Sequence, residues 1–271
     1  MQKHLTSIQN PLVKQVVQLS EKSKERKKQG LFVVEGLREI VLALKGTYIL
    51  KTLFYCDEII SVEALKVFQG NSDHPYELIS VSKEVYEKMA YRASTEGVIG
   101  LFQTKSHLLS DLHFTTKNPL ILVAEAPEKP GNIGALLRTA DAAKLDAVII
   151  ANPKTDLYNP NSIRSSVGCV FTNQVATGST KEILHYLKQH HIAIFSAALQ
   201  ASIPYVDCDF KNATAIVVGT EAEGLSDVWL TESDQNIMIP MQGHIDSMNV
   251  SVAAGILIFE AKRQRGFSLP D

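Results

Sequence analysis

The pattern of apolar positions changes near residue 118. Beyond that point, strand-length runs that are apolar at nearly every position alternate with amphipathic helical segments such as STKEILHYLKQHH. Continuous apolar runs are typical of parallel strands that are buried on both faces. The alternation therefore predicts an α/β domain with a parallel sheet between two layers of helices. The runs are PLILVAEA, DAVIIAN, IAIFSAAL, ATAIVVGT and NIMIPM.

The first hundred residues alternate in the same way over shorter elements. Extended apolar runs such as LFVVEG and YILKTLFY are followed by helical ones such as LREIVLALKG, whose final glycine is typical of a helix end. This order predicts a separate, smaller α/β domain. Between the domains, TKSHLLSDLHFTTKN has weak periodicity and several Ser, Thr and Asp residues, which indicates a linker. We therefore expect a first domain at 1–107, a linker at 108–117 and a second domain at 118–271.

The stretch 237–265 predicts a short strand, a polar turn and a closing helix. Within the turn, Ser247 or Asn249 can cap the helix, because either side chain can accept a hydrogen bond from a first-turn amide. Taken alone, this segment is explained by a capped terminal helix that closes a core. The helix has one apolar face at the i, i+3, i+4, i+7 spacing, formed by Val250, Ala253, Ala254, Leu257, Ile258 and Ala261.

Composition limits the class of protein. With 45% apolar and 21% charged residues, the 271-residue chain is of ordinary globular composition and long enough for one large or two modest domains. No apolar run approaches the ~18 residues that span a bilayer, and the N-terminus lacks the apolar core of a secretory signal. We therefore expect a cytoplasmic protein without membrane contact. The three cysteines are widely spaced and show no CxxC or nearby His pattern, so we expect buried free thiols and no metal site.

Positive charge is concentrated in the first domain. The net charge of −2 argues against a protein that coats nucleic acid indiscriminately, so any RNA affinity has to come from local patches. Residues 1–117 carry 16 Lys+Arg and 13 Asp+Glu, a net charge of +3, which leaves 11 and 16, a net charge of −5, for 118–271. The densest basic run lies at 21–30, where a solvated helix face is the ordinary explanation and RNA contact is the alternative. Its cations are Lys22, Lys24, Arg26, Lys27 and Lys28.

Three polar motifs follow one another in the second domain. They are NIGALLRTA at 132–140, GTEAEGLS at 219–226 and IPM-x-G-x-x-DS-x-NVS-x-A from Ile239 onward. In order and spacing they resemble the SpoU (TrmH) branch of the SPOUT RNA methyltransferases, over roughly Pro119 to Arg265. In the first domain, FVVEGLREIVLAL resembles the start of the family's ribosomal-protein-like (L30e-like) substrate domain, which is a weaker match.

The resemblance implies a fold and an activity. The implied fold is the SPOUT α/β fold with a deep trefoil knot, in which the segment after IPM passes through an earlier loop, and the implied assembly is a homodimer. The implied reaction is transfer of the methyl group of S-adenosylmethionine to a ribose 2′-hydroxyl of structured RNA. We expect ribosomal RNA first and transfer RNA second, because such N-terminal domains read RNA shape and single-stranded loops. Two alternatives stay open, namely a catalytically silent RNA-binding or ribosome-assembly protein with this fold, and an enzyme that methylates a base.

The resemblance also assigns site residues. The family ties the arginine of the first motif to catalysis, and the implied catalytic set is Asn132, Arg138, Glu221, Ser247 and Asn249. The implied cofactor contacts are Gly219, Ile239 and Met248. Two positions depart from the usual pattern, because Met248 stands where Leu is common and Ala222 where Gly is common. Arg164, in NPNSIRSSVG, resembles a further segment near the RNA, although a helix start explains it nearly as well.

Each motif has a structural explanation beside the functional one. The helix start at Asn132 is a ready phosphate site, because free amides and the helix dipole favour an anion, and it is equally an ordinary capped helix. GTEAEGLS is neither GxGxxG nor GxxxxGK[ST], but its glycines permit a tight loop whose backbone can bind an adenosine group. Within that loop, Glu221 is otherwise a plain surface acid. A guanidinium stays protonated at neutral pH, so Arg138 can clamp a phosphate and stabilise an alkoxide instead of accepting the proton, and both roles stay open.

Overall fold

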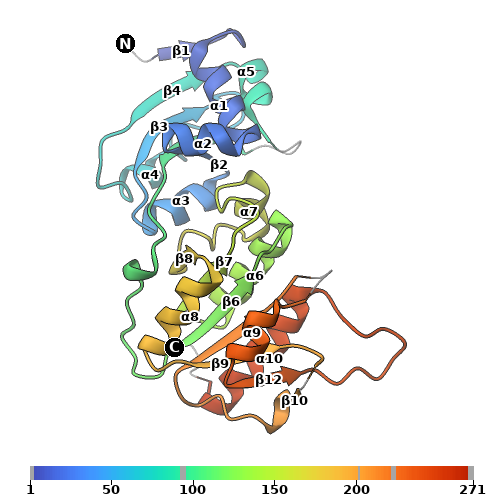
Figure 1. The fold of residues 1–271 in the computed structure, drawn as a ribbon. Helices are drawn as coiled ribbons and strands as arrows, with labels where there is room; N and C mark the ends of the chain where they lie inside the picture. The colour runs from blue at the N-terminus through green and yellow to red at the C-terminus, as the bar shows by residue number, and fades with distance from the viewer. Residues whose placement is uncertain (1–2, 92–95, 201, 221–223, 268–271) are drawn as a thin grey trace. The chain divides into compact units, whose positions relative to one another are not determined.

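The computed structural model describes residues 3–91, 96–200, 202–220 and 224–267. The chain divides into two compact units (Figure 1). Unit 1 comprises residues 1–105 and 156–172, and unit 2 comprises residues 106–155 and 173–271. The boundaries expected from the sequence did not foresee that 156–172, a segment from within the second domain, belongs with the first.

Unit 1 is built on a five-stranded mixed sheet with the order β1-β4-β3-β5-β2. The last strand, β5, runs antiparallel to both of its neighbours, and the remaining pairs are parallel. Its strands are β1 (Lys3–Leu5), β2 (Leu31–Glu35), β3 (Leu50–Tyr55), β4 (Glu77–Val81) and β5 (Val98–Gln103). Its helices are α1 (Pro11–Glu21), α2 (Ser23–Gln29), α3 (Leu37–Lys45), α4 (Lys66–Gln69), α5 (Lys83–Met89) and α7 (Pro160–Ser165).

Local sequence explains the first helix of this unit. The side chain of Asn10 accepts a hydrogen bond from the amide of Leu12, and Pro11 stands at the first helical position, where a missing N–H costs nothing. Val13, Val16 and Leu19 then fall on one face and are buried. This face packs with the sheet and α5 in a single apolar core.

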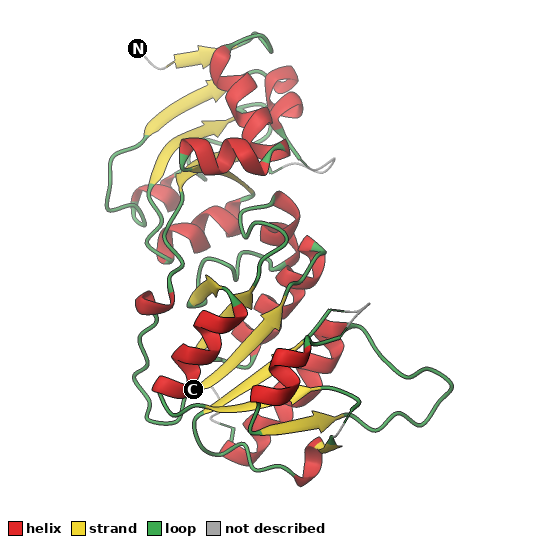
Figure 2. Ribbon diagram, viewed as in Figure 1, coloured by secondary structure: helices red, strands yellow, loops and turns green. Residues whose placement is uncertain are grey.

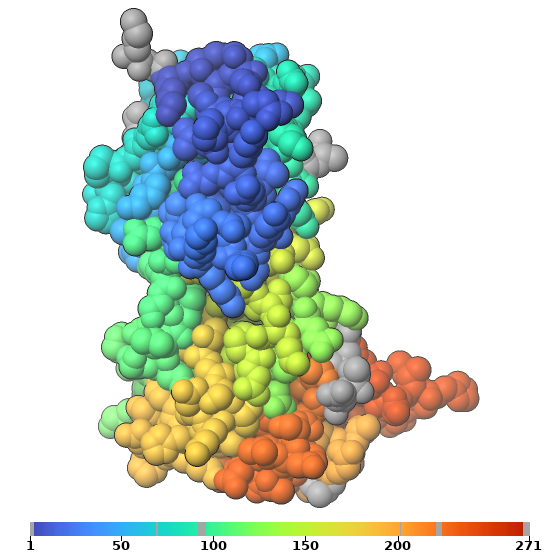
Figure 3. All heavy atoms as spheres, turned by 45° about the horizontal axis from the view of Figure 1, so that its top comes forward, coloured from blue at the N-terminus to red at the C-terminus, as the bar shows by residue number. Residues whose placement is uncertain are grey.

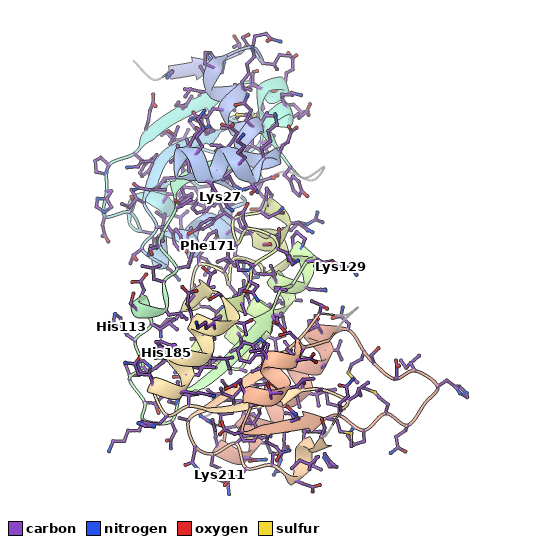
Figure 4. The ribbon with its side chains drawn as sticks, viewed as in Figure 1. Lys27, His113, Lys129, Phe171, His185 and Lys211 are labelled. Carbon is purple, nitrogen blue, oxygen red and sulfur yellow. The ribbon has the colours of Figure 1, made fainter. Side chains whose placement is uncertain are left out.

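An aromatic stack and an ion pair hold residues 156–172 in unit 1. The ring of Tyr158 stacks on Phe32 of β2 with 4.1 Å between centroids, and Phe171 lies 5.8 Å from the same ring (Figure 4). Asp156 accepts hydrogen bonds from the Nε and Nη2 atoms of Arg26 on α2. Burial of the stack raises the pKa of Tyr158. Partners so distant in sequence explain why the apolar pattern did not reveal this association.

Unit 2 is built on a seven-stranded sheet with the order β10-β12-β9-β11-β6-β7-β8, in which every pairing is parallel. Helices cover both faces (Figure 2). The strands are β6 (Leu120–Glu125), β7 (Ala147–Ala151), β8 (Val175–Gly178), β9 (Ala193–Ala197), β10 (Ile203–Pro204), β11 (Thr214–Val218) and β12 (Gln235–Met238). The helices are α6 (Pro130–Ala142), α8 (Thr180–Gln189), α9 (Asp227–Glu232) and α10 (Val250–Arg265), with 3-10 turns at Leu109–Asp111 and Tyr205–Asp207.

The central strands of this sheet are buried on both faces, as their continuous apolar sequences predicted. All residues of β6, β7 and β11 are buried. One set of alternate side chains, including Ile121 and Val217, packs under α8 and α9 together with Trp229. On the other face α10 packs against α6 and β11, and it buries Ala254, Leu257 and Ile258.

The order of the strands marks where a ligand can bind. After β6 the chain moves outward to β7 and β8, and it later returns to place β11 on the opposite side of β6. The direction of winding therefore reverses between β6 and β11. In open parallel sheets, ligands bind beyond the carboxyl ends of the strands at such a reversal.

The last turn of α10 is hydrogen-bonded to the opposite end of the sheet, where β6 and β11 begin. The guanidinium of Arg265 donates to three carbonyl oxygens, those of Phe210, Asn118 and Asn212, which precede β11 and β6. Burial lowers the pKa of this guanidinium. The side chain of Gln264 adds hydrogen bonds with the amide of Phe210 and the carbonyl of Cys208. The helix is thus fixed along its axis from its C-terminal end.

Candidate active site

A cavity of about 620 Å³ opens at the carboxyl ends of β9, β11 and β12. Its volume lies in the range typical of small-molecule sites, roughly 300–1,000 Å³. It lies beside the strand reversal described above, between the ends of these strands and the start of α10. The predicted cofactor residues Gly219, Ile239 and Met248 all line it, and so does Ser247. The structure therefore brings together two motifs that lie about twenty residues apart in sequence.

The charged side chains of this cavity are acidic. Among the described residues, Asp227 and Asp246 are its charged lining groups, and neither lysine nor arginine lines it. The remaining lining is mainly aliphatic and thioether side chains with exposed backbone. Such a site favours a ligand that is apolar over much of its surface and carries a positive charge.

A closed loop shapes one wall of the cavity, and it requires glycine at its first position. Thr220 and Gly224 exchange two backbone hydrogen bonds of 3.0 and 3.1 Å, which join the two ends of the loop. A Cβ atom on Gly219 would lie 2.2 Å from the carbonyl carbon and oxygen of Gly224. Gly224 itself has a φ of +71°, a conformation that favours glycine. The predicted catalytic Glu221 and the neighbouring Ala222 lie outside the described residues.

A buried carboxylate that the sequence reasoning missed positions the end of this loop. Glu125, the last residue of β6, is buried, and its two oxygens accept hydrogen bonds of 2.8 Å from the amide and hydroxyl of Ser226. It also accepts a 3.1 Å hydrogen bond from the hydroxyl of Thr180 on α8. The sequence did contain a signal for this role. A carboxylate at the end of a fully apolar strand is expected to be buried, and a buried carboxylate needs hydrogen-bond partners.

A second hollow of about 230 Å³ lies on the other side of the same loop. Gly219, Thr220 and Val250 line both hollows, so the two share a wall. Asn132 of α6 lines the smaller one. Its Oδ1 atom accepts a hydrogen bond of 3.5 Å from Nδ2 of Asn249. The first and third motifs therefore meet at the start of α10.

Asn249 also begins α10, as its capping role predicted. Its Oδ1 atom accepts hydrogen bonds of 2.9 Å from the amide and 2.6 Å from the hydroxyl of Ser251. One asparagine thus both starts the helix and contacts α6. Of the two capping candidates in the sequence, Asn249 performs the role, while Ser247 lies in the cavity lining.

Arg138 lies on α6 but lines neither hollow. It is exposed, and it makes no hydrogen bond or ion pair with any residue that the structure describes. Six residues separate it from Asn132, which corresponds to about 240° around a helix axis, so the two side chains leave the helix in different directions. The arginine and the asparagine of the first motif are therefore not brought together within one chain.

The basic run in unit 1 divides into exposed lysines and one buried arginine. Arg26 is 2% exposed, and besides its pairing with Asp156 it donates to the carbonyls of Leu19 and Ser20. Its prediction as an RNA contact is corrected, because its guanidinium is enclosed and used within the fold. Arg164, on α7 of the same unit, is exposed. The exposed lysines of the run are Lys22, Lys24, Lys27 and Lys28.

The fold and the site define a class of protein, an α/β enzyme that binds a cofactor beyond the carboxyl ends of a parallel sheet. Residues 119–259 match the SpoU rRNA Methylase family, and residues 10–100 match the MRM3-like substrate binding domain. The first match covers more than half of the chain. The chain belongs to the SpoU rRNA methylase family.

Similar proteins cover nearly the whole chain. A relative from Bacillus subtilis (strain 168), 23S rRNA (guanosine(2553)-2′-O)-methyltransferase RlmP, is 28% identical over 96% of this chain and 99% of its own. A crystal structure described as an RNA 2′-O ribose methyltransferase is 37% identical, has a TM-score of 0.82, and is matched over 97% of this chain and 99% of its own. The SpoU methyltransferase AviRb from Streptomyces viridochromogenes, in complex with the cofactor AdoMet, is 26% identical with a TM-score of 0.86, over 95% and 98% of the two chains.

These comparisons confirm the predicted family, the parallel α/β fold of the catalytic part and the class of enzyme. They also confirm S-adenosylmethionine as the cofactor, and the cavity fits this molecule. Its acidic lining suits a sulfonium cation, its volume suits a nucleoside with an amino-acid tail, and the absence of a side chain at Gly219 leaves backbone accessible. No described helix is long and apolar enough to cross a bilayer, and no cluster of metal-ligating side chains occurs among the residues described.

Proposed function

We propose that this protein transfers the methyl group of S-adenosylmethionine to a ribose 2′-hydroxyl of structured RNA, with ribosomal RNA as the first target and transfer RNA as the second. The observation that carries the proposal is the acidic, glycine-walled cavity beside the strand reversal. The relatives support the target, because the Bacillus subtilis protein is named for a ribose of 23S rRNA. The MRM3-like substrate binding domain matched in unit 1 supports an RNA-contacting role for its exposed lysines.

The cofactor is held chiefly by backbone in this proposal. Gly219, Ile239 and Met248 provide amides and carbonyls around the cavity, and Asp227 and Asp246 supply negative charge. When bound, S-adenosylmethionine supplies a methyl group that its sulfonium already activates. What the chain has to add is the position of the acceptor hydroxyl, because alignment of two reactants removes much of a bimolecular barrier.

Arg138 acts on the RNA side of the reaction. Its guanidinium stays protonated at neutral pH and can form two parallel hydrogen bonds to a phosphate. We assign it the clamping of a backbone phosphate and the stabilisation of the developing alkoxide. Asn132, which contacts Asn249, lines the smaller hollow and can orient the ribose.

The proposal includes a homodimer, because Arg138 does not line the cavity of its own chain. Beside it, α10 exposes Val252 and Phe259, at 53% and 43%, on the helix that packs against α6. Exposed apolar side chains on a helix that packs against the helix of Arg138 favour a partner surface. We assign this face to a second copy, in which Arg138 of one protomer serves the cavity of the other. A trefoil knot around the cavity and a cytoplasmic location belong to the same proposal.

A labelled-methyl assay tests the reaction. The full-length protein is incubated with S-adenosylmethionine and ribosomal RNA transcribed in vitro, and the RNA is then digested to nucleosides for mass spectrometry. We expect one 2′-O-methylnucleoside. A methylated base would assign the enzyme to base methylation, and failure to bind S-adenosylmethionine by calorimetry would support the silent RNA-binding protein.

A further inference from the structure

The smaller hollow differs from the larger one in its charge. Lys129 lies at the start of α6 (Figure 4). It lines this hollow, and no other described lysine or arginine lines either hollow. The adjacent Glu128 also lines it and offsets part of this charge, but both side chains are exposed, so solvent and salt screen their interaction. Among the described residues, the lysine or arginine that lines one of these two hollows is therefore Lys129, and the arginine singled out by the sequence motif lines neither.

The size of the smaller hollow suits a fragment of a nucleotide. Its 230 Å³ corresponds to roughly eight water molecules at ~30 Å³ each, which is below the usual size of a site for a whole drug-sized ligand. Its polar side chains include the amide of Asn132 and the hydroxyl of Thr220, which can pair with a sugar hydroxyl. A ribose with one phosphate matches this volume and this set of groups.

The position of the hollow places such a fragment next to the methyl donor. Gly219, Thr220 and Val250 line both hollows, so a group bound in one lies close to a group bound in the other. In the proposed reaction the acceptor hydroxyl has to come within contact distance of the activated methyl group. Because the same three residues line both hollows, the smaller hollow is next to the space in which the methyl donor is proposed to bind.

We propose that the smaller hollow is the subsite for the target nucleotide's ribose, and that Lys129 binds the phosphate attached to it. This inference rests on the proposed function and names the side chain that holds the RNA backbone at the reaction centre. Lysine contacts a phosphate as a point charge, so the contact requires charge more than a particular shape. Lys129 and Arg138 then contact different phosphates or come from different protomers.

The test compares three variants of the full-length protein on the same unmodified ribosomal RNA transcript. They are Lys129→Ala, Lys129→Arg and the control Lys181→Ala, which removes an exposed lysine of unit 2 that lines neither hollow. Initial methylation rates are measured against RNA concentration at saturating S-adenosylmethionine, at several salt concentrations. Cofactor affinity is measured separately by calorimetry without RNA.

We expect Lys129→Ala to raise the KM for RNA about five- to tenfold and to reduce the slope of log affinity against log salt by about 0.7–0.9, the value for one phosphate contact. Lys129→Arg should restore most of the affinity, Lys181→Ala should resemble wild type, and cofactor affinity should stay unchanged in all three.

Two results would overturn the subsite. One is wild-type KM and salt slope in Lys129→Ala, and the other is lost cofactor binding in that variant, which would make its role structural. If the wild-type protein itself methylates no ribose, the proposed function fails, and this outcome is distinct from either result for Lys129.

Discussion

The two ends of the seven-stranded sheet differ in whether their polar groups are bonded within the fold or surround open space. At the amino end, polar side chains are hydrogen-bonded to backbone groups. Asp146 accepts a 2.7 Å hydrogen bond from the amide of Leu120, and Asp234 accepts one of 2.8 Å from the amide of Ile194. At the carboxyl end, two hollows open around a closed glycine loop. The mostly exposed segment between β12 and α10 projects outward from unit 2 (Figure 3). One helix, α10, joins the two ends.

This difference shows how the residues of an open site are held in position. The C-terminal turn of α10 is held by hydrogen bonds of Arg265 and Gln264, while its N-cap residue, Asn249, contacts Asn132. Because a helix is rigid along its axis, fastening one end sets the position of the other. Substitutions at the carboxyl end should therefore alter binding or catalysis, and substitutions at the amino end should alter stability.

Arg138→Ala should give the largest effect of all. Removal of one preorganised electrostatic group typically costs about a hundred- to a thousandfold in rate. We expect single-turnover methylation to fall by that order, while S-adenosylmethionine affinity changes less than about threefold, because Arg138 lines neither hollow. Arg138→Lys should not restore the rate, since an ammonium lacks the planar two-pronged contact. Near-normal turnover of the Ala variant would remove Arg138 from the mechanism.

Gly219→Ala should weaken the cofactor instead of the chemical step. The added Cβ atom would lie 2.2 Å from the backbone of Gly224, so the loop has to move. Forced overpacking costs about 1–3 kcal/mol, which predicts S-adenosylmethionine binding weaker by about ten- to a hundredfold in calorimetry. Gly243→Ala is the matched control, because a Cβ atom there meets nothing within 4 Å. Equal cofactor affinity in both variants would contradict the role of the closed loop.

Arg265→Ala tests the amino end. The loss of charged hydrogen bonds to three carbonyls should lower the free energy of unfolding by about 2 kcal/mol, measured by urea denaturation. The folded variant should keep its cofactor affinity within about threefold. Lys262→Ala provides the control, since this lysine of the same helix makes no side-chain hydrogen bond or ion pair with any described residue. A variant of Arg265 that is stable but loses cofactor binding would contradict the separation of the two ends.

The smallest effect concerns acid stability. Hydrogen bonds from Arg263 and Gln264 lower the pKa of Glu260 from its ordinary value to about 2. A carboxylate with a depressed folded-state pKa stabilises the fold above its unfolded pKa, and this contribution disappears as the pH falls toward 2. Glu260→Gln should therefore reduce the difference in Tm between pH 7 and pH 3, whereas Glu63→Gln should leave it unchanged. An unaltered difference in Glu260→Gln would remove this carboxylate from the acid response.

Sequence alone predicted the parts of this molecule that depend on local pattern. Five strands of the parallel sheet were evident, because strands buried on both faces are apolar throughout. The short edge strands β8 and β10 were not, since neither forms such a run. The family resemblance assigned Asn132 and Asn249 to one implied catalytic set, and their mutual contact was found only in the structure.

What could not be predicted depends on partners distant in sequence. The placement of 156–172 in unit 1 relies on Phe32 and Arg26, more than a hundred residues earlier. A run of cations does not reveal which member is buried, so Arg26 resembled its lysine neighbours. The direction in which the Arg138 side chain points depends on how α6 is rotated about its axis relative to the sheet, and the sequence does not show this rotation. Lys129 went unnoticed because its importance arises from a hollow formed by three separate segments.

The most direct test of the central claim is a map of 2′-O-methylated positions in ribosomal RNA from cells with and without the gene. The account predicts that deletion removes one ribose methyl group and that the wild-type gene restores it. It also predicts that a gene carrying Arg138→Ala does not restore it, although this variant still binds S-adenosylmethionine. An unchanged map of ribosomal RNA after deletion, with no ribose methyl group lost from transfer RNA either, would contradict the claim that this cavity serves ribose methylation.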